Sequence, residues 1–471
     1  MKTTYTIIAA VVVILIIVIG VVAYTQLNQS PSPSASPTPT LAPTEAPTVA
    51  PTETATVAPT ASATPSSTNS AGPTPTATPV PTPVVTPTPQ IIYITPPPTA
   101  APTPTPTPAP TQLASASVLG SGGSLVNPIM QTWVSTYQLV QPKVQVTYNS
   151  IGSGTGITQF QQQITNFGET DVPLTASNIN GLPSGTTALT VPISASAIVP
   201  AYNIQLLNGS NCNNGLNFTG AVLANIFLGN ISKWNDPQIT TLQSASVAAQ
   251  LPNQNIVVIH RSDSSGTMYA FTDYLAKASS QWLSKVGPAS KTPAWPVGLG
   301  YSLNSGVAAG IIQNPDSIGP LEIAYVLQNP GTIFYGAMLN AANNYVFPSV
   351  ATAQAALDAG ATMLPAGNNM TAWSSVSIID NIFNDTTAAT AYPITTMTYA
   401  IVYQQQAYPS SGPFSAAQAA ATINFLHWVV NSGQVLGPNA GYVALPASII
   451  AIDNATLAQA TYNGQSITIL S

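Results

Sequence analysis

The stretch Arg261-Ser262-Asp263-Ser264-Ser265-Gly266-Thr267 joins two regular patterns in the sequence. The β-branched run Ile256–Ile259 precedes it and is typical of a strand, and the helical pattern Thr267–Ala276 follows it. A helix start exposes unpaired backbone N–H groups and the positive end of the helix dipole, and small hydroxyl residues let an oxyanion approach them. We therefore predict an anion site here, with a guanidinium supplied by Arg261, the only arginine of the chain.

Two further stretches have the same order of strand pattern, small turn and helix pattern. They are Gly120-Ser121-Gly122-Gly123-Ser124-Leu125 and Gly152-Ser153-Gly154-Thr155-Gly156. Each alone is more often an ordinary connection with a helix cap, and Arg261 alone could form a surface ion pair with Asp263. Three such turns in one chain, one of them with a guanidinium, favour anion binding.

Short β-branched runs alternate with helical patterns after residue 113. This alternation predicts an α/β protein with largely parallel sheets covered by helices. Strands are expected at Val144–Tyr148, Ala197–Tyr202, Ile256–Ile259 and Thr398–Val402, and helices at Met130–Val140, Ile157–Ile164, Thr267–Ala276 and Ala416–Asn431.

The segment before residue 113 has a different character. The apolar run Ile7–Ala23 is long enough for a membrane span, so residues 1–28 are expected to form an anchor, although a cleaved signal stays an alternative. Lys2 before the run predicts an inward amino terminus and an extracellular remainder. Residues 29–112 are mainly Pro, Thr, Ser and Ala, which predicts a disordered, extended tether whose hydroxyls are candidates for O-linked sugar.

Charged residues make up only 4% of the chain, whereas the hydrophobic fraction of 45% is ordinary. The scarcity of cations argues against a nucleic-acid partner. Asn, Gln, Ser and Thr replace the charges, which suits a glycosylated surface and an acidic exterior, and we expect both, in a protein of an acid-living archaeon. Sequons that agree with an exported glycoprotein occur at Asn28, Asn208, Asn217, Asn230, Asn369, Asn384 and Asn454.

The remaining reactive side chains predict neither a metal site nor catalysis. Cys212 is the only cysteine and is interpreted as incidental, with an intermolecular bridge as the lesser alternative. His260 should point away from the Arg261 side of its strand and pack there, and His427 should be a buried or partly buried helix residue. Two distant histidines and one cysteine give no coordination pattern. A hydrolase built on His260 would lack a third orienting group, so we expect no enzyme and no cofactor.

A series of short motifs covers nearly all of Ser117–Leu457. They are Gly120–Leu125 with Pro128 and Trp133, Gly152-Ser153, Phe167-Gly168 with Asp171, Ile226–Gly229 with Lys233–Asp236, Arg261–Thr267, Trp295–Gly300, Ile318-Gly319 with Glu322 and Tyr325, Tyr392–Thr395, and Tyr442–Pro446. In these motifs and their order the chain resembles the phosphate-binding proteins of ABC-type phosphate importers, the PstS family.

The resemblance implies a role for each matching residue. Arg261 would bind the anion bidentately, with Asp263 orienting its fork, and Asp171 would accept a hydrogen bond from a protonated phosphate oxygen. Sulfate has no proton to give, so Asp171 would exclude it. The other donors would be the hydroxyls and amides of Ser124 and Ser153, the amide of Leu125, and the helix-start cradle of Ser265, Gly266 and Thr267.

Some positions depart from the family pattern. Ser124 stands where the family usually has Thr, and Leu125 where it often has Phe, and both keep the polar contact. Glu169 is either a solvated loop residue or a neighbour that raises the pKa of Asp171, which in acid would weaken the exclusion of sulfate. The stretch 208–217 reads as a surface insertion.

The resemblance also implies a two-lobed α/β fold like that of periplasmic binding proteins, of the type with two chain crossings. Lobe I would comprise residues 113–203 and 395–471, and lobe II residues 204–394. We expect a protein anchored on the outer face of the cytoplasmic membrane that captures inorganic phosphate between the lobes and delivers it to the permease and ATPase of an ABC importer. The alternatives are a structural or adhesive surface protein that reuses the fold, a binder of another tetrahedral oxyanion, and a phosphate-releasing enzyme.

Overall fold

The computed structural model describes residues 112–407 and 414–470. All of them belong to one unit of the chain, Pro102–Ser471. The expected anchor at 1–28 and the expected tether at 29–112 lie outside the described residues, apart from Gln112. Within the described ranges, no helix has both the length and the apolar character needed to cross a membrane.

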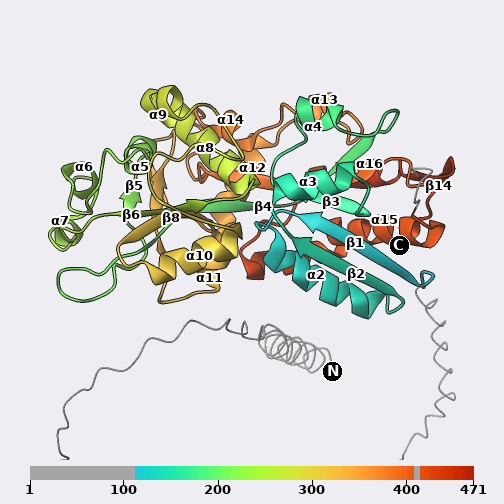
Figure 1. Cartoon of the computed structure of the whole chain (residues 1–471), viewed down its shortest axis with the longest axis horizontal. Coiled ribbons are helices and arrows are strands. Elements are labelled where there is room, and N and C mark those ends of the chain that lie inside the picture. Colours follow the sequence, from blue (N-terminus) through green and yellow to red (C-terminus); the bar gives the residue numbers. More distant parts are fainter. Residues whose placement is uncertain (1–111, 408–413, 471) are drawn as a thin grey trace, which may run out of the picture. The chain divides into compact units, whose positions relative to one another are not determined.

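A nine-stranded sheet forms the centre of the described structure (Figure 1). Eight strands follow each other in the order β2-β1-β3-β12-β4-β8-β6-β7, and β9 pairs with β4 beside this path. Their bounds are β1 Ala116–Gly122, β2 Val144–Ser150, β3 Phe167–Thr170, β4 Ala188–Asn203, β6 Val257–Arg261, β7 Leu299–Tyr301, β8 Ser317–Glu322, β9 Phe334–Tyr335 and β12 Thr395–Tyr403. Smaller sheets contain β5 Asn217–Phe218, β10 Ala337–Leu339 and β11 Tyr345–Val346, and β13 Thr461–Tyr462 with β14 Gln465–Ser466.

The sheet is mixed, which corrects the expectation of largely parallel sheets. Strands β1, β2 and β3 pair in parallel, and so do β6, β7 and β8. Between these two sets, β12 runs antiparallel to both β3 and β4, and β4 runs antiparallel to β8. The alternation of strands and helices gives the parallel outer sets but carries no information on the direction of long central strands.

Strand β4 belongs to both halves of the sheet. Residues Ala188–Ala197 pair with β12, whereas Ile198–Asn203 pair with β8. Pro192 lies inside this strand at a register shift, where the pairing with β12 passes from Thr398 to Tyr399. A proline cannot donate a ladder hydrogen bond and is tolerated at such a bulge. We call β1, β2, β3, β12 and the first part of β4 the first strand group, and the second part of β4 with β6, β7 and β8 the second strand group.

Helices cover the sheet (Figure 1). In the first strand group, α2 packs on β2, α15 on β1, and α3 on β3, and in the second α10 packs on β6 and β8. The helices are α2 Asn127–Val140, α3 Ser153–Gln161, α4 Ala176–Asn180, α5 Gly220–Phe227, α6 Pro237–Thr240, α7 Ala245–Ala248, α8 Gly266–Ala278, α9 Ser280–Lys285, α10 Leu303–Gln313, α11 Ile323–Leu327, α12 Val350–Gly360, α13 Met370–Trp373, α14 Ile378–Ile382, α15 Ala416–Val430 and α16 Ala447–Leu457, with 3-10 turns η1 Ser432–Leu436 and η2 Pro438–Ala440.

Helix α2 shows how the sequence builds these contacts. Its buried residues Ile129, Met130, Trp133 and Tyr137 recur at helical spacing and so form one apolar face. The indole N–H of Trp133 donates to the carbonyl of Gly433 at 2.8 Å, which ties this face to η1 near the end of the chain. The position of α2, and of the turn before it, is therefore fixed by segments far apart in sequence.

All four expected strands and all four expected helices are confirmed, with small shifts at their ends. The largest difference concerns the strand expected at Ala197–Tyr202, which is the last part of the much longer β4.

Candidate anion-binding site

The three predicted strand–turn–helix connections all exist and meet between the two strand groups. They are β1 to α2, β2 to α3, and β6 to α8. The amide of Gly154 donates to the carbonyl of Ser264 at 3.2 Å, and the amide of Asn304 donates to the hydroxyl of Ser124 at 3.0 Å. The predicted site side chains are all at most 2% exposed, namely Ser124, Leu125, Ser153, Asp171, Arg261, Ser265 and Thr267.

Arg261 is the last residue of β6, and its guanidinium is held on two sides. Its Nε and Nη2 donate to the two carboxylate oxygens of Asp263 at 2.7 and 2.5 Å, and its Nη1 donates to Asn304 Oδ1 at 2.9 Å. Burial would raise the pKa of Asp263, but the hydrogen bonds and charge of Arg261 outweigh it and lower that pKa. The arginine is buried, so the alternative of a surface ion pair is wrong, and its guanidinium is held against the carboxylate of Asp263.

Asn304 was not found by sequence reasoning. It is fully buried near the start of α10 and contacts both Arg261 and Thr267, whose hydroxyl lies 3.4 Å from its Nδ2. The residue before it, Leu303, has a left-handed backbone, with φ of 63°, and its amide donates to Asp263 at 3.0 Å. No motif marks these residues in the sequence, because their role comes from tertiary contact alone.

The start of α8 lies beside Asp171. Ser265 caps the helix, and its hydroxyl accepts from the amide of Met268 at 3.3 Å. The amide of Thr267, at the second position of the helix, is a hydrogen-bond partner of Asp171. The positive end of the helix dipole therefore faces this carboxylate and whatever anion binds next to it.

Asp171 follows β3 and has one satisfied and one unsatisfied oxygen. The hydroxyl of Ser153 donates to Oδ2 at 3.1 Å, while Oδ1 is buried and has no hydrogen-bond partner among the described residues. A β-carbon on Gly123 would lie 2.8 Å from Oδ1, so this oxygen faces the turn between β1 and α2. Burial raises the pKa of Asp171 to about 6, although Arg261 opposes the shift. The free oxygen is an acceptor without a donor.

Glu169 lies in β3 and is fully buried, so its interpretation as a solvated loop residue is wrong. Its carboxyl contacts the amide of Gly123, the hydroxyl of Thr398 and, at 2.9 Å, the hydroxyl of Tyr148. Burial, and then the charge of Asp171, raise the pKa of Glu169 well above its ordinary value. Burial and the neighbouring charge of Asp171 therefore both disfavour the ionised form of Glu169.

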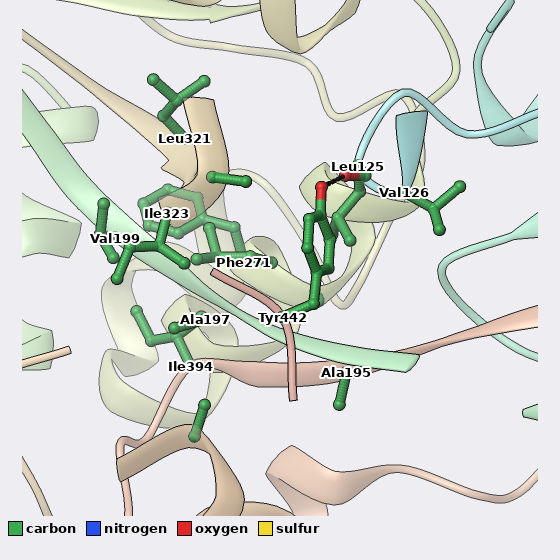
Figure 2. Close-up of a cluster of buried hydrophobic side chains, with 14 of the residues drawn as sticks. Leu125, Val126, Ala195, Ala197, Val199, Phe271, Leu321, Ile323, Ile394 and Tyr442 are labelled. Atoms are coloured by element: carbon green, nitrogen blue, oxygen red, sulfur yellow. Dashed lines mark hydrogen bonds between the residues drawn. The ribbon is translucent and has the colours of Figure 1, made fainter. Parts of the chain in front are cut away.

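Three tyrosine hydroxyls hold three consecutive carbonyls of the turn between β1 and α2. We call them the tyrosine clamp. Tyr148 donates to Gly123 O at 2.7 Å, Tyr325 to Ser124 O at 2.6 Å, and Tyr442 to Leu125 O at 2.6 Å, the last of which is drawn in Figure 2. In a trans peptide the C=O and N–H point in opposite directions, so these bonds orient the amides that follow, at Ser124, Leu125 and Val126.

Lys291 is a second cation near the site that sequence reasoning missed. Its carbonyl accepts from the amide of Ser265 at 3.0 Å, which joins its loop to the start of α8. The residue as a whole is partly exposed, but the protein around its ammonium group shields it from water and lowers its pKa to about 8. The charges of Asp171 and Glu169 act in the opposite direction. Its ammonium group therefore lies within electrostatic reach of both acids.

The two histidines take the packing positions predicted for them. His260 stacks on Trp295 with ring centroids 4.8 Å apart, and His427 is partly exposed on α15. Cys212 is 3% exposed and packs in the core, which disfavours an intermolecular bridge. Among the described residues, no group of three His, Cys, Asp or Glu is placed to hold a metal ion.

Comparisons with known proteins bear on this site. A family model described as a PBP superfamily domain matches residues 105–432. The phosphate-binding protein PstS of Xylella fastidiosa (strain 9a5c) is 34% identical over 339 residues, which are 72% of this chain and 84% of that protein. The phosphate-binding protein PstS of Pasteurella multocida (strain Pm70) is 33% identical over 334 residues, 71% of this chain and 88% of that protein.

One solved structure supports the fold. It is a high-affinity periplasmic phosphate-binding protein, PfluDING, bound with phosphate, and the comparison gives a TM-score of 0.55 at 19% identity. It covers 72% of this chain and 93% of the other.

Proposed function

This chain belongs to the PstS family of phosphate-binding proteins, and from that premise we propose that it captures inorganic phosphate at the site around Arg261 and Asp171. Arg261 contributes the cation, through the guanidinium N–H groups that Asp263 and Asn304 do not use. The amides of the β1–α2 turn and of the α8 start contribute dipoles, together with hydroxyls of the predicted site residues. The relatives are named as binding proteins, which supports a binder rather than an enzyme.

The observation that carries this proposal is the unpartnered oxygen Oδ1 of Asp171. A buried acceptor without a donor is costly, and a ligand that brings a proton to it removes that cost. Phosphate at neutral pH carries a proton on one oxygen, whereas sulfate carries none. With sulfate in the site, the carboxylate of Asp171 and a sulfate oxygen would face each other as two acceptors with no proton between them. A carboxylate at this position therefore selects phosphate over sulfate.

The arrangement of the chain supports a two-lobed receptor. Strand β4 pairs with β12 in one strand group and with β8 in the other, as expected for a chain segment that crosses between lobes. We place lobe I at 113–203 and 395–471 and lobe II at 204–394. In this proposal the lobes close on phosphate, and the loaded receptor docks on the permease of an ABC importer.

We further propose that the protein is held at the cell surface by residues 1–28 and extended from the membrane by 29–112. The sequence supports this through the apolar run and the Pro/Thr composition. Glycosylation is supported by four sequon asparagines that are exposed in the described structure, Asn208, Asn230, Asn369 and Asn384.

Calorimetric titration with phosphate and with sulfate at pH 5 and pH 7.5 tests the function. We expect tight binding of phosphate at both pH values and weak binding of sulfate at pH 7.5. Absence of binding heat with phosphate at both values would favour a structural or adhesive protein that reuses the fold. Equal affinities for the two anions at pH 7.5 would instead favour a general binder of tetrahedral oxyanions.

A further inference from the structure

Two tyrosines of the tyrosine clamp each contact two oxygen atoms through one hydroxyl, but a phenol hydroxyl has only one proton to donate. The hydroxyl of Tyr148 lies 2.7 Å from Gly123 O and 2.9 Å from Glu169 Oε2. A carbonyl oxygen can only accept, so the contact with Gly123 takes the proton of Tyr148. Oε2 of Glu169 also accepts from the amide of Gly123. The contact with Tyr148 is then a hydrogen bond only if Glu169 carries its proton on this same oxygen and donates it to the phenol.

The same count of donated protons applies to Tyr442, the third tyrosine of the clamp. The hydroxyl of Tyr442 lies 2.6 Å from Leu125 O and 3.2 Å from Glu322 Oε2. The other oxygen of Glu322 accepts from the hydroxyl of Ser196 at 2.8 Å and from the amide of Ala324 at 2.9 Å. Both of these groups are donors, so the proton of Glu322 belongs on Oε2, where it faces the phenol oxygen.

Tyr325, the second tyrosine of the clamp, needs no carboxylic acid as a hydrogen-bond donor. The hydroxyl of Tyr325 donates to Ser124 O at 2.6 Å, and the side chain of Asn127 is its other hydrogen-bond partner. An amide group donates at every pH. Tyr325 thus performs the same task as Tyr148 and Tyr442 without a titrating partner, which makes it an internal control.

We propose that Glu169 and Glu322 are positioning residues of the anion site that act in their protonated form. Each donates to a tyrosine hydroxyl, which then holds a carbonyl of the β1–α2 turn and aims the next amide at the anion. Loss of either proton turns the tyrosine toward the carboxylate, releases the carbonyl, and adds a negative charge near the bound anion. This inference rests on the proposed function, since it assigns these acids to the phosphate site.

The surroundings of both acids support their protonated form. Burial is the main cause that raises the pKa of Glu322 to about 8 and that of Glu169 well above its ordinary value, and the charge of Asp171 raises both further. The charged or titratable groups that face Glu169 are Asp171, Tyr148 and Lys291, and those that face Glu322 are Asp171, Tyr325 and Tyr442. Of these groups, only Lys291 also titrates near pH 8.

The protonation state can be measured directly in the full chain. The sequence has only four glutamates, Glu45, Glu53, Glu169 and Glu322. After labelling of the glutamate side-chain carboxyl with ¹³C, we expect two of the four NMR signals to stay at the protonated position at pH 7, and E169Q and E322Q each to remove one of them. Four ionised signals at pH 7 in the unmodified chain would overturn the proposal without any variant.

The consequence for binding is measured as phosphate affinity between pH 7.5 and 9.5, where most of the free phosphate is already the dianion. K291Q serves as the reference chain, because it removes the titration of the lysine. We expect K291Q to lose about tenfold in affinity over this range, in line with one hydrogen bond to a charged ligand. K291Q/E322Q should lose clearly less affinity than K291Q over the same range, because glutamine donates to Tyr442 at every pH.

A matched control separates this effect from general damage to the turn. Y325F/K291Q should bind phosphate more weakly at every pH and keep the slope of K291Q. Equal slopes for K291Q and K291Q/E322Q would contradict the proposal. Absence of phosphate binding in the unmodified chain would contradict the proposed function instead, and the NMR signals would still decide whether the two acids are protonated.

Discussion

A β-carbon added to Gly266 would lie 2.6 Å from the β-carbon of Asp171, far closer than two carbons pack. The start of α8, which follows β6 of the second strand group, therefore lies against the side chain of Asp171, which follows β3 of the first. Only a residue without a side chain allows this approach. The contact brings the helix dipole of α8 to the same place as the carboxylate that we assign to phosphate selection.

We predict that G266A weakens phosphate binding by about tenfold or more. The added methyl group must push α8 away from Asp171, and overpacking of this kind costs about 1–3 kcal/mol. Isothermal titration at pH 7.5 measures the loss. G306A is the matched control, because a β-carbon on this helical glycine of α10 meets Tyr301 only at an ordinary 3.4 Å. Equal affinities of the two variants would argue against the contact as a determinant of the site.

The selectivity of the site should depend on pH through Asp171. Its folded pKa is raised to about 6, so the group is an acceptor-only carboxylate above pH 6 and gains a proton as the pH falls below it. A protonated Asp171 can donate to sulfate. We predict that the ratio of phosphate to sulfate affinity falls as pH decreases from 7.5 to 5, measured by competition of sulfate against phosphate.

D171N is the direct test of this explanation. Asparagine can donate at every pH, so the variant should bind sulfate at pH 7.5 more tightly than the native chain and show little change in selectivity with pH. A variant that still rejects sulfate as strongly as the native chain at pH 7.5 would show that another group makes the distinction.

We predict that K291Q weakens phosphate binding at pH 6.5 by roughly five- to tenfold, as expected for the loss of one partly buried charge near an anion. The folded pKa of Lys291 is lowered to about 8, so the ammonium form is present below pH 8 and is lost above it. The difference between K291Q and the native chain should therefore shrink at pH 9, and titrations at the two pH values check this. K285Q, on the exposed face of α9, should bind phosphate like the native chain at both.

The sequence predicted those parts of the site that depend on local pattern. A strand run, a Gly/Ser turn and a helix start are adjacent in sequence, so Arg261 and Ser265–Thr267 could be identified as a candidate anion-binding turn before any tertiary contact was known. The mixed centre of the sheet could not be predicted, because the alternation of strand and helix patterns carries no information on the direction of the long strands β4 and β12.

The missed contacts have a different cause. Tyr442 and Leu125 are 317 residues apart, and Asn304 reaches Ser124 across 180 residues. No spacing rule connects such positions. The burial of Glu169 was missed for the same reason, because its partner Thr398 comes from β12. Sequence pattern and the family resemblance therefore identified the groups that we propose to face the anion, and tertiary contacts supply the groups that hold them in place.

Asp453 on α16 provides a test of stability away from the site. It is fully buried, and neither carboxylate oxygen has a hydrogen-bond partner among the described residues. Burial raises its folded pKa well above the ordinary value. Because the folded pKa exceeds the unfolded one, its contribution to stability is fully present below about pH 4 and is lost as the pH rises toward the folded pKa.

We therefore predict that D453L raises the free energy of unfolding at pH 7 by about 1–3 kcal/mol, the usual cost of an unsatisfied buried polar group. The gain should be smaller at pH 4, where the native carboxyl is nearer its neutral form, and urea unfolding at the two pH values measures it. D358L, at an exposed position of α12, should change stability by less than about 0.5 kcal/mol. A loss of stability in D453L at pH 7 would mean that this carboxyl has a stabilising partner in solution, since burial alone predicts the opposite sign.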